Sequence, residues 1–477
     1  MRPGAFCFGA GTCWRSLGAT LSAAETAGDA LTAAKPSLFV ALMSRPAVFG
    51  SLIPIVTLLN AGVGMALPQM MDPRSFGEYA LVVTLFNYGL IFDVGISQVI
   101  DLKVPAHLGQ GRPDLAMNVG AKLIWLRLYI GVATFLVTTA ILVALARSGA
   151  LPFNLAAGIL AALAGLADMV ALGPACFYRA SSARRNYAIA IATLLTGLIV
   201  ARLGGLMAGG LVGCFAALAV WYVVLAGVFN RRFRPAVDAM PSRREAWSTI
   251  VFGLPFFATS FIWAFYVTGN RWIASFLIDP SQFGHFAFSA NIFSLLVGAA
   301  GGFSAFYYPR IAERISQSAH FEVSAQLMRD LCRLVGAMAV IVAVGMLLAG
   351  FLMGLVYPQY LPGVQTARII LVAVPPMVLA SWLMPVSLSG GGRPLFEGLV
   401  IYPTATVILA VCITLLYHMF GDEGAAAAST IAALPLIGMQ LWRLNHMGII
   451  GARHCWTIMA ATSLLSAALG ILAGVLG

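Results

Sequence analysis

The chain has 477 residues, of which 60% are hydrophobic and 9% are charged, and its mean hydropathy is +0.92. Soluble domains carry about a quarter charged residues, so this composition excludes a soluble protein and predicts an all-α polytopic membrane protein. The net charge of +11 does not indicate a nucleic-acid partner, because the basic residues fall in short loops on one side of the membrane.

The predicted elements begin after a segment, residues 1–45, that is poor in charge and lacks the pattern of a secretory signal. We expect this segment to be a cytoplasmic extension. The apolar segments that follow are close to the length of about 20 residues that crosses a bilayer. We place the spans at residues 47–71, 77–100, 119–146, 152–174, 187–204, 206–229, 248–278, 283–309, 334–356, 367–389, 395–417, 424–442 and 455–476.

The connections between these spans alternate between basic and nearly neutral, which predicts the orientation. The basic connections are residues 103–122, 179–185, 231–244, 310–333, 393 and 443–453. The other connections carry little beyond Arg74, Arg147 and Arg368. The N-terminus is therefore expected in the cytoplasm.

One motif occurs twice in the chain, 207 residues apart. Residues 72–80 read DPRSFGEYA and residues 279–287 read DPSQFGHFA, so five of nine positions are identical. Each copy has an apolar run, an Asp-Pro turn, Phe-Gly, a second apolar run and a basic exit. Six helices per half is an even number, so both copies face the same way. The duplication predicts two like bundles related by an axis along the membrane normal, as in many transporters.

The repeat and the span count together predict the organisation of the chain. Each half is expected to hold six helices, with a cytoplasmic linker between the halves and one additional helix at the end. The predicted parts are residues 46–230, 231–247, 248–445 and 455–476. The seven cysteines are dispersed, without paired spacing, and are interpreted as small core residues. We therefore expect no metal site, no disulfide and no cofactor.

Several segments resemble one known family. The first half contains FGEYALVVTLFNYGLIFDVGISQVI, and the second contains FGHFAFSANIFSLLVGAAGGFSAFYYPRIAE, YPQYLPGVQTARIILVAVPPMVLASWLMPVSLSGGGRP and GDEGAAAASTIAA. In this order and spacing they resemble the oligosaccharide flippases, the polysaccharide-biosynthesis membrane proteins of the MATE-like superfamily. The resemblance covers about residues 46–445. The chain departs from the family in its odd span count and in its few basic residues within spans.

The resemblance implies a fold of twelve to fourteen helices in two lobes. It also implies a function, the movement of undecaprenyl-pyrophosphate-linked oligosaccharide across the bacterial inner membrane by alternating access, for lipopolysaccharide or exopolysaccharide biosynthesis. The implied partners are the lipid-linked oligosaccharide, membrane lipids, a polysaccharide polymerase with its chain-length machinery, and H+ or Na+ as coupling ion. Family cavities are typically lined by basic residues.

Ionisable groups within spans cost several kcal/mol unless they are paired or wetted, so each is a functional candidate. Asp93 and Arg127 each lie about eight residues from the cytoplasmic end of their spans, a shared depth of roughly 12 Å. We expect either a neutralised buried pair or a role in coupling or head-group binding. Asp168 lies close enough in depth to compete for Arg127. A carboxylate that changes partner would serve ion-coupled exchange.

Arg271 lies about eight residues from the outer end of its span, and its counterpart in the first copy is Gly64. The charge is therefore peculiar to the second half. A guanidinium fork matches pyrophosphate oxygens, so we predict that Arg271 and Asn270 contact the substrate head group. Outward snorkelling of Arg271 is the alternative. Arg202 and Arg368 lie at a similar depth and are further candidates for the cavity.

Two spans carry features that bear on helix geometry. Gly89, Asp93, Ser97 and Asp101 recur at i+4, which predicts a polar stripe along one continuous helix at residues 77–100. Prolines break the hydrogen-bond ladder of the span at residues 367–389, which predicts either a moving bend or a static kink there. These prolines are Pro375, Pro376 and Pro385.

An enzyme is not expected, because the outer loops are short and the six histidines are scattered, with no visible catalytic cluster. The nearer rival is a MATE-type, cation-coupled antiporter of drugs or organic cations with the same fold. Cation binding favours acidic residues in the N-terminal bundle, and the span at residues 47–71 contains none. The sequence therefore favours the flippase over the antiporter.

Overall fold

The computed structural model describes residues 59–60, 62–181, 183–232, 240–316, 320–389 and 396–477. Every regular element within these residues is helical. Eight of their helices are long and apolar enough to cross a membrane, or nine if one bent pair counts as a single span. The expected N-terminal extension, residues 47–58 of the first span and residues 233–239 of the linker lie outside the described residues.

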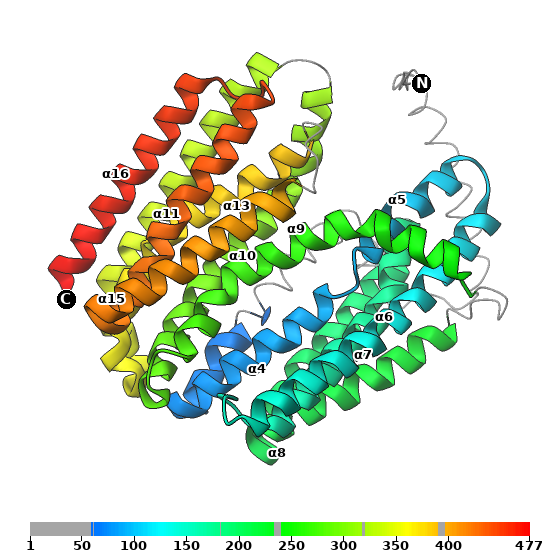
Figure 1. Cartoon of the computed structure of the whole chain (residues 1–477), viewed down its shortest axis with the longest axis horizontal. Coiled ribbons are helices and arrows are strands. Elements are labelled where there is room, and N and C mark those ends of the chain that lie inside the picture. Colours follow the sequence, from blue (N-terminus) through cyan, green and yellow to red (C-terminus); the bar gives the residue numbers. More distant parts are fainter. Residues whose placement is uncertain (1–58, 61, 182, 233–239, 317–319, 390–395) are drawn as a thin grey trace.

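The helices form two groups that follow each other along the chain. The first group comprises η1 (Leu67–Gln69), α4 (Pro73–Ile91), α5 (Ile96–Gly109), α6 (Pro113–Arg147), α7 (Leu155–Ala180) and α8 (Arg184–Arg232). The second comprises α9 (Arg243–Ser275), α10 (Pro280–Ser316), α11 (His320–Val356), η2 (Pro358–Gly363), α12 (Val364–Leu371), α13 (Val374–Ser389), the π-helical turn η3 (Glu397–Ile401), α15 (Tyr402–His446) and α16 (Ala452–Leu476). In Figure 1 the two groups lie side by side, and α4 contacts α9 and α10 between them.

Two of the longest helices are pairs that fold back on themselves. Helix α8 is interrupted at Gly209 and at Gly210, where φ is 58°, and α15 is interrupted at Gly421, where φ is 62°. A side chain at Gly210 or Gly421 would be strained, because L residues rarely adopt this left-handed conformation. The sequence predicts two spans in each of these segments, at residues 187–204 and 206–229 and at residues 395–417 and 424–442, and the structure shows two helices in each.

The prediction of one continuous helix at residues 77–100 is wrong. Helix α4 ends at Ile91, Val94 and Gly95 have φ of 51° and 75°, and α5 begins at Ile96. Asp93 lies in the break, so the predicted polar stripe does not run along one helix. The break persists because the Asp93 carboxylate accepts hydrogen bonds from the N–H groups of Gly95 (3.0 Å) and Ser97 (2.9 Å), an alternative to the helical ladder.

The proline-rich span is bent, as its sequence predicts. Helices η2 and α12 together meet α13 at 45°. The bend immediately precedes Pro375 and Pro376, which therefore lie in the first turn of α13, where a missing N–H is tolerated.

The two copies of the repeated motif meet in the structure. Gly77 on α4 faces Gly284 on α10, its counterpart 207 residues later, and a Cβ on Gly284 would lie 1.8 Å from the Pro73 carbonyl oxygen. Further along the same helices, Arg271 donates to Thr84 Oγ1 and Asn291 donates to the Gly64 carbonyl, both at 3.4 Å. Residues 64 and 271, and residues 84 and 291, are counterparts at the same offset. The two copies therefore contact each other through an approximate two-fold relation.

Both copies begin at one end of the molecule, which we call the Asp-Pro end. Here Asp72 and Asp279 cap the starts of α4 and α10, and each carboxylate accepts a hydrogen bond from a serine hydroxyl at 2.6 Å. These hydrogen bonds hold the pKa of both carboxyl groups below the usual value.

Hydrogen bonds also join the second group of helices to the first at the Asp-Pro end. Side chains of η2 and of the residue before it donate to main-chain carbonyls of the segment that leads into α4. We call these four hydrogen bonds the Asp-Pro clasp. The donors and the carbonyl acceptors are Tyr357 and Met65 (2.7 Å), Gln359 and both Pro68 and Met71 (2.7 Å each), and Tyr360 and Met71 (3.2 Å). The clasp and the Gly77 to Gly284 contact close the two groups onto each other at this end.

Candidate functional site

Arg271 is buried where the two groups of helices meet. Its side chain is 4% exposed, and it extends from α9 toward α4 and α10. The guanidinium donates to Thr84 Oγ1 (3.4 Å), to the Ala290 carbonyl (3.0 Å) and to Ser294 Oγ (2.8 Å). Outward snorkelling, the alternative that the sequence left open, is therefore wrong.

The charge of Arg271 is not neutralised within the described part of the chain. Its three hydrogen bonds go to neutral oxygens, and no carboxylate lies within 4 Å of it there. Its Nε and the Oδ1 of Asn270, which is 2% exposed, have no hydrogen-bond partner among the described residues. A buried cation that is solvated only by neutral groups is costly, and an anion in contact with it would lower that cost.

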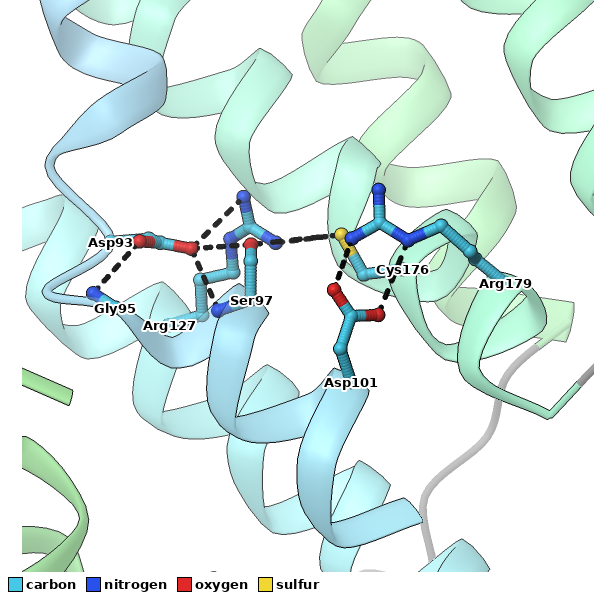
Figure 2. Close-up of polar contacts among 7 residues, drawn as sticks. All are labelled: Asp93, Gly95, Ser97, Asp101, Arg127, Cys176 and Arg179. Carbon is cyan, nitrogen blue, oxygen red and sulfur yellow. Dashed lines mark hydrogen bonds and ion pairs between the residues drawn. The ribbon is translucent and has the colours of Figure 1, made fainter. Parts of the chain in front are cut away.

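Asp93 and Arg127 lie together in the first group of helices. Figure 2 shows the Asp93 carboxylate at the α4–α5 break facing the Arg127 guanidinium of α6, with 3.6 Å between Oδ2 and Nη2. Both side chains are buried. The carboxylate also accepts from Ser97 Oγ at 2.5 Å. The sequence predicts that these two residues can pair, and the geometry is that of a neutralised pair that also caps α5.

A second ion pair fixes the same short helix two turns further on. Asp101 on α5 accepts two hydrogen bonds from Arg179 of α7, at 3.2 Å and 2.6 Å. Cys176 lies between the two pairs, 3.6 Å from both Ser97 Oγ and Arg127 Nη1 (Figure 2). Asp101 therefore attaches α5 to α7, and Asp93, in the break just before α5, pairs with Arg127 of α6.

Asp168 on α7 is buried, and Arg127 forms its ion pair with Asp93 and not with Asp168. No ion pair or hydrogen bond reaches its carboxylate from the residues that the structure describes. Arg127 and Arg202 are both close enough to act on its charge. Arg202 on α8 donates to Asn60 Oδ1 at 3.1 Å and lies 5.9 Å from the centroid of the Phe86 ring. Asp168 thus lies in the field of two guanidinium groups without contacting either.

Arg368 does not join these residues. Its guanidinium donates to the carbonyl of Met346 on α11 (3.3 Å) and to that of Leu476, the last residue of α16. A cation at the C-terminus of a helix satisfies free carbonyls there, which is a structural role. The predicted cavity role of Arg368 finds no support in its contacts, and we leave this residue out of the candidate site.

The sequence analysis missed the neutral partners of Arg271. Thr84 is fully buried on α4, and Ser294 lies on α10 beside the Ala290 carbonyl. One signal was available, because Thr84 and Asn291 are counterparts in the repeat, and both are polar within apolar runs. Only the meeting of the two copies brings these side chains to Arg271.

Comparison with solved structures identifies the fold. An inward-facing multidrug resistance MATE family transporter of the MOP superfamily aligns with a TM-score of 0.60 and 15% identity, over 85% of this chain and 98% of that one. The lipid II flippase MurJ in an inward closed conformation aligns with a TM-score of 0.60 and 10% identity, over 90% and 97%. A point mutant of the Vibrio cholerae MATE transporter VcmN aligns with a TM-score of 0.57 and 14% identity, over 90% and 98%.

No protein-family model and no curated protein matches the sequence. The structural likenesses, at identities of 15% or less, show that the chain has the all-α fold of MATE-like transporters. With its apolar helices, this fold makes it a multi-pass membrane protein.

Proposed function

We propose that the chain is a flippase that moves a polyprenyl-pyrophosphate-linked oligosaccharide across the bacterial inner membrane by alternating access, with its N-terminus in the cytoplasm. The observation that carries this proposal is the buried guanidinium of Arg271, which has no anionic partner among the described residues. A pyrophosphate supplies the missing anion and accepts from the guanidinium fork. The same cation repels positively charged drugs.

The position of Arg271 fits a transported ligand rather than a fixed one. Its partners lie on α4 of the first group of helices and on α10 of the second. When the two groups separate in a transport cycle, the hydrogen bond between Arg271 and Thr84 breaks. The guanidinium of Arg271 is then free to bind the anionic ligand. MurJ, one of the proteins with this fold, is described as a lipid II flippase, so the fold accommodates such a substrate.

A cation-coupled antiporter is the second candidate, and Asp168 favours it. A buried carboxylate without an ion pair among the described residues can take up a proton, a sodium ion or an organic cation. In the flippase, Asp168 would instead bind the coupling ion, H+ or Na+, while Asp93 remains paired with Arg127. A polysaccharide polymerase with its chain-length machinery would receive the translocated substrate.

Reconstituted vesicles distinguish the two functions. The assay follows a fluorescent polyprenyl-pyrophosphate-linked sugar and, in parallel, efflux of ethidium. We expect lipid translocation that falls at least tenfold in Arg271→Gln. Arg368→Gln is the matched control, because that arginine contacts only carbonyls of the second group, and it should keep the wild-type rate. Ethidium efflux without lipid translocation would establish the antiporter instead.

A further inference from the structure

A cavity of about 430 Å³ with a mixed polar and apolar lining lies at the Asp-Pro end, beyond Arg271. Residues of α4 and of the α6–α7 loop line it from the first group of helices, and residues of α9 and α10 line it from the second. The polar and aromatic lining residues are Arg74, Glu78, Phe153, Asn154, Ser275 and Phe283. Its volume falls in the range of small-molecule sites, about 300 to 1,000 Å³.

The position of the cavity relative to Arg271 follows from residue positions along three helices, α9, α4 and α10. Ser275 follows Arg271 by one turn of α9, about 6 Å along the axis at about 1.5 Å per residue. Glu78 precedes Thr84 by six residues of α4, and Phe283 precedes Ala290 by seven residues of α10, which correspond to roughly 9 Å and 10 Å. Along the helix axes, these lining residues therefore lie about 6 to 10 Å closer to the Asp-Pro end than Arg271, Thr84 and Ala290.

The lining suits a neutral ligand that is rich in hydroxyl groups. Arg74 and Glu78 cancel in charge, and neither side chain makes an ion pair with another described residue. Asn154 uses its Oδ1 to cap α7, which leaves its amide N–H groups to donate. Ser275 donates to the Trp272 carbonyl, so its oxygen remains an acceptor.

Apolar side chains make up the rest of the lining, and besides two phenylalanines they are Leu151, Pro152 and Pro280. Phe153 and Phe283 border the cavity, and the Phe153 ring packs edge-on against Trp272, with 6.1 Å between the ring centroids. A sugar ring presents hydroxyl groups at its edge and apolar C–H groups on its faces, so it needs donors, acceptors and aromatic surface together. A polyprenyl tail would leave the Arg74 and Glu78 charges desolvated and unpaired.

We propose that this cavity is a carbohydrate subsite, which holds the sugar nearest the pyrophosphate while the pyrophosphate contacts Arg271. The inference rests on the proposed function and extends it, because it makes the glycan a recognised part of the substrate. Since both groups of helices line the cavity, separation of the groups at the Asp-Pro end takes the subsite apart and releases the sugar.

The test uses proteoliposomes of the full chain and fluorescent short-chain polyprenyl pyrophosphates that carry no sugar, one glucose or one N-acetylglucosamine. In the wild type we expect faster translocation of at least one sugar-bearing lipid than of the sugar-free lipid. Glu78→Gln should lower the sugar-bearing rate about tenfold or more, since a charged hydrogen bond is lost, and should change the sugar-free rate less than twofold. Glu423→Gln, an exposed glutamate of α15 outside the cavity lining, is the matched control and should change neither rate.

The outcomes distinguish failure of the subsite proposal from failure of the proposed flippase function. If Glu78→Gln lowers both rates equally, or neither, the subsite is wrong, while the proposed function stands on the wild-type rates and on Arg271→Gln. If the wild type moves none of the sugar-bearing lipids, the proposed function fails, and the subsite fails with it. Should Glu78→Gln not reach the membrane, Arg74→Gln, at an exposed position of the same cavity, decides by the same criteria.

Discussion

Replacing Gln359 by leucine should open the Asp-Pro end. The Gln359 amide donates to the carbonyls of Pro68 and Met71, at 2.7 Å each, and so joins the two groups of helices. Each such hydrogen bond contributes about 0.5 to 1.5 kcal/mol net, so the closed state should lose about 1 to 3 kcal/mol relative to the open one. That loss corresponds to a population shift of roughly 5-fold to 150-fold.

Thiol labelling measures this shift. A cysteine at Ala287, which is fully buried on α10 three residues beyond Gly284, reports separation of the two copies. In a background without the seven native cysteines, the maleimide labelling rate in detergent tracks the open population when opening and closing are fast. We expect the Gln359→Leu rate to exceed the parent rate by roughly 5-fold to 150-fold.

Gln365→Leu provides the matched control. The Gln365 amide donates to the Ala473 carbonyl of α16 at 3.1 Å, within the second group of helices, so its loss should not change labelling of the cysteine at position 287. Equal labelling rates in Gln359→Leu and its parent, with both proteins folded, would refute the idea that the clasp holds this end closed. An equal increase in both leucine variants would show general loosening instead.

The remaining predictions concern stability in detergent, measured by thermal or chemical unfolding. Asp72→Ala should cost about 1 kcal/mol through loss of the α4 cap. Because its hydrogen bonds lower the pKa of Asp72 in the folded state, its contribution should be complete above about pH 4 and disappear as the pH falls further. Gly95→Ala should cost more than about 2 kcal/mol, since φ is 75° and the added Cβ would lie 2.2 Å from an α9 carbonyl oxygen, whereas Gly109→Ala meets open space and should be nearly neutral. Arg127→Leu should cost about 3 to 5 kcal/mol by leaving Asp93 unpaired, and Asp93→Asn in the same chain should recover much of it, because asparagine keeps the cap without the charge.

Features set by composition and local chemistry could be predicted from the sequence. Hydropathy predicts the membrane helices, and the motif at Asp72 and Asp279 predicts two helix starts that the structure shows as capped turns. Pro375 and Pro376 predict the bend between α12 and α13. Each of these signals is contained within a few neighbouring residues, so no knowledge of the tertiary structure is needed.

The break after α4 could not be predicted in this way. The stretch around Asp93 is as apolar as a continuous helix, and a single aspartate with a glycine two residues later is a weak local signal. The conformation is stabilised by Arg127 of α6 and by close approach to Gly253 of α9, which are distant in sequence. The role of Gln359 was missed for the same reason, since its acceptors are carbonyls nearly 300 residues earlier.

The repeat explains why the candidate site lies at the contact between the copies and why it is nevertheless asymmetric. On one side of the two-fold relation, Asn291 donates to the Gly64 backbone; on the other side, Arg271 replaces that glycine and reaches Thr84. A symmetric arginine would place two buried cations close to the same axis, and each would raise the cost of the other. One arginine concentrates the positive charge on a single helix, α9, one turn before Ser275 of the cavity lining. A substrate with one anionic group and a neutral glycan needs this polarity, because only one orientation then places the charge on Arg271 and the sugar toward the Asp-Pro end.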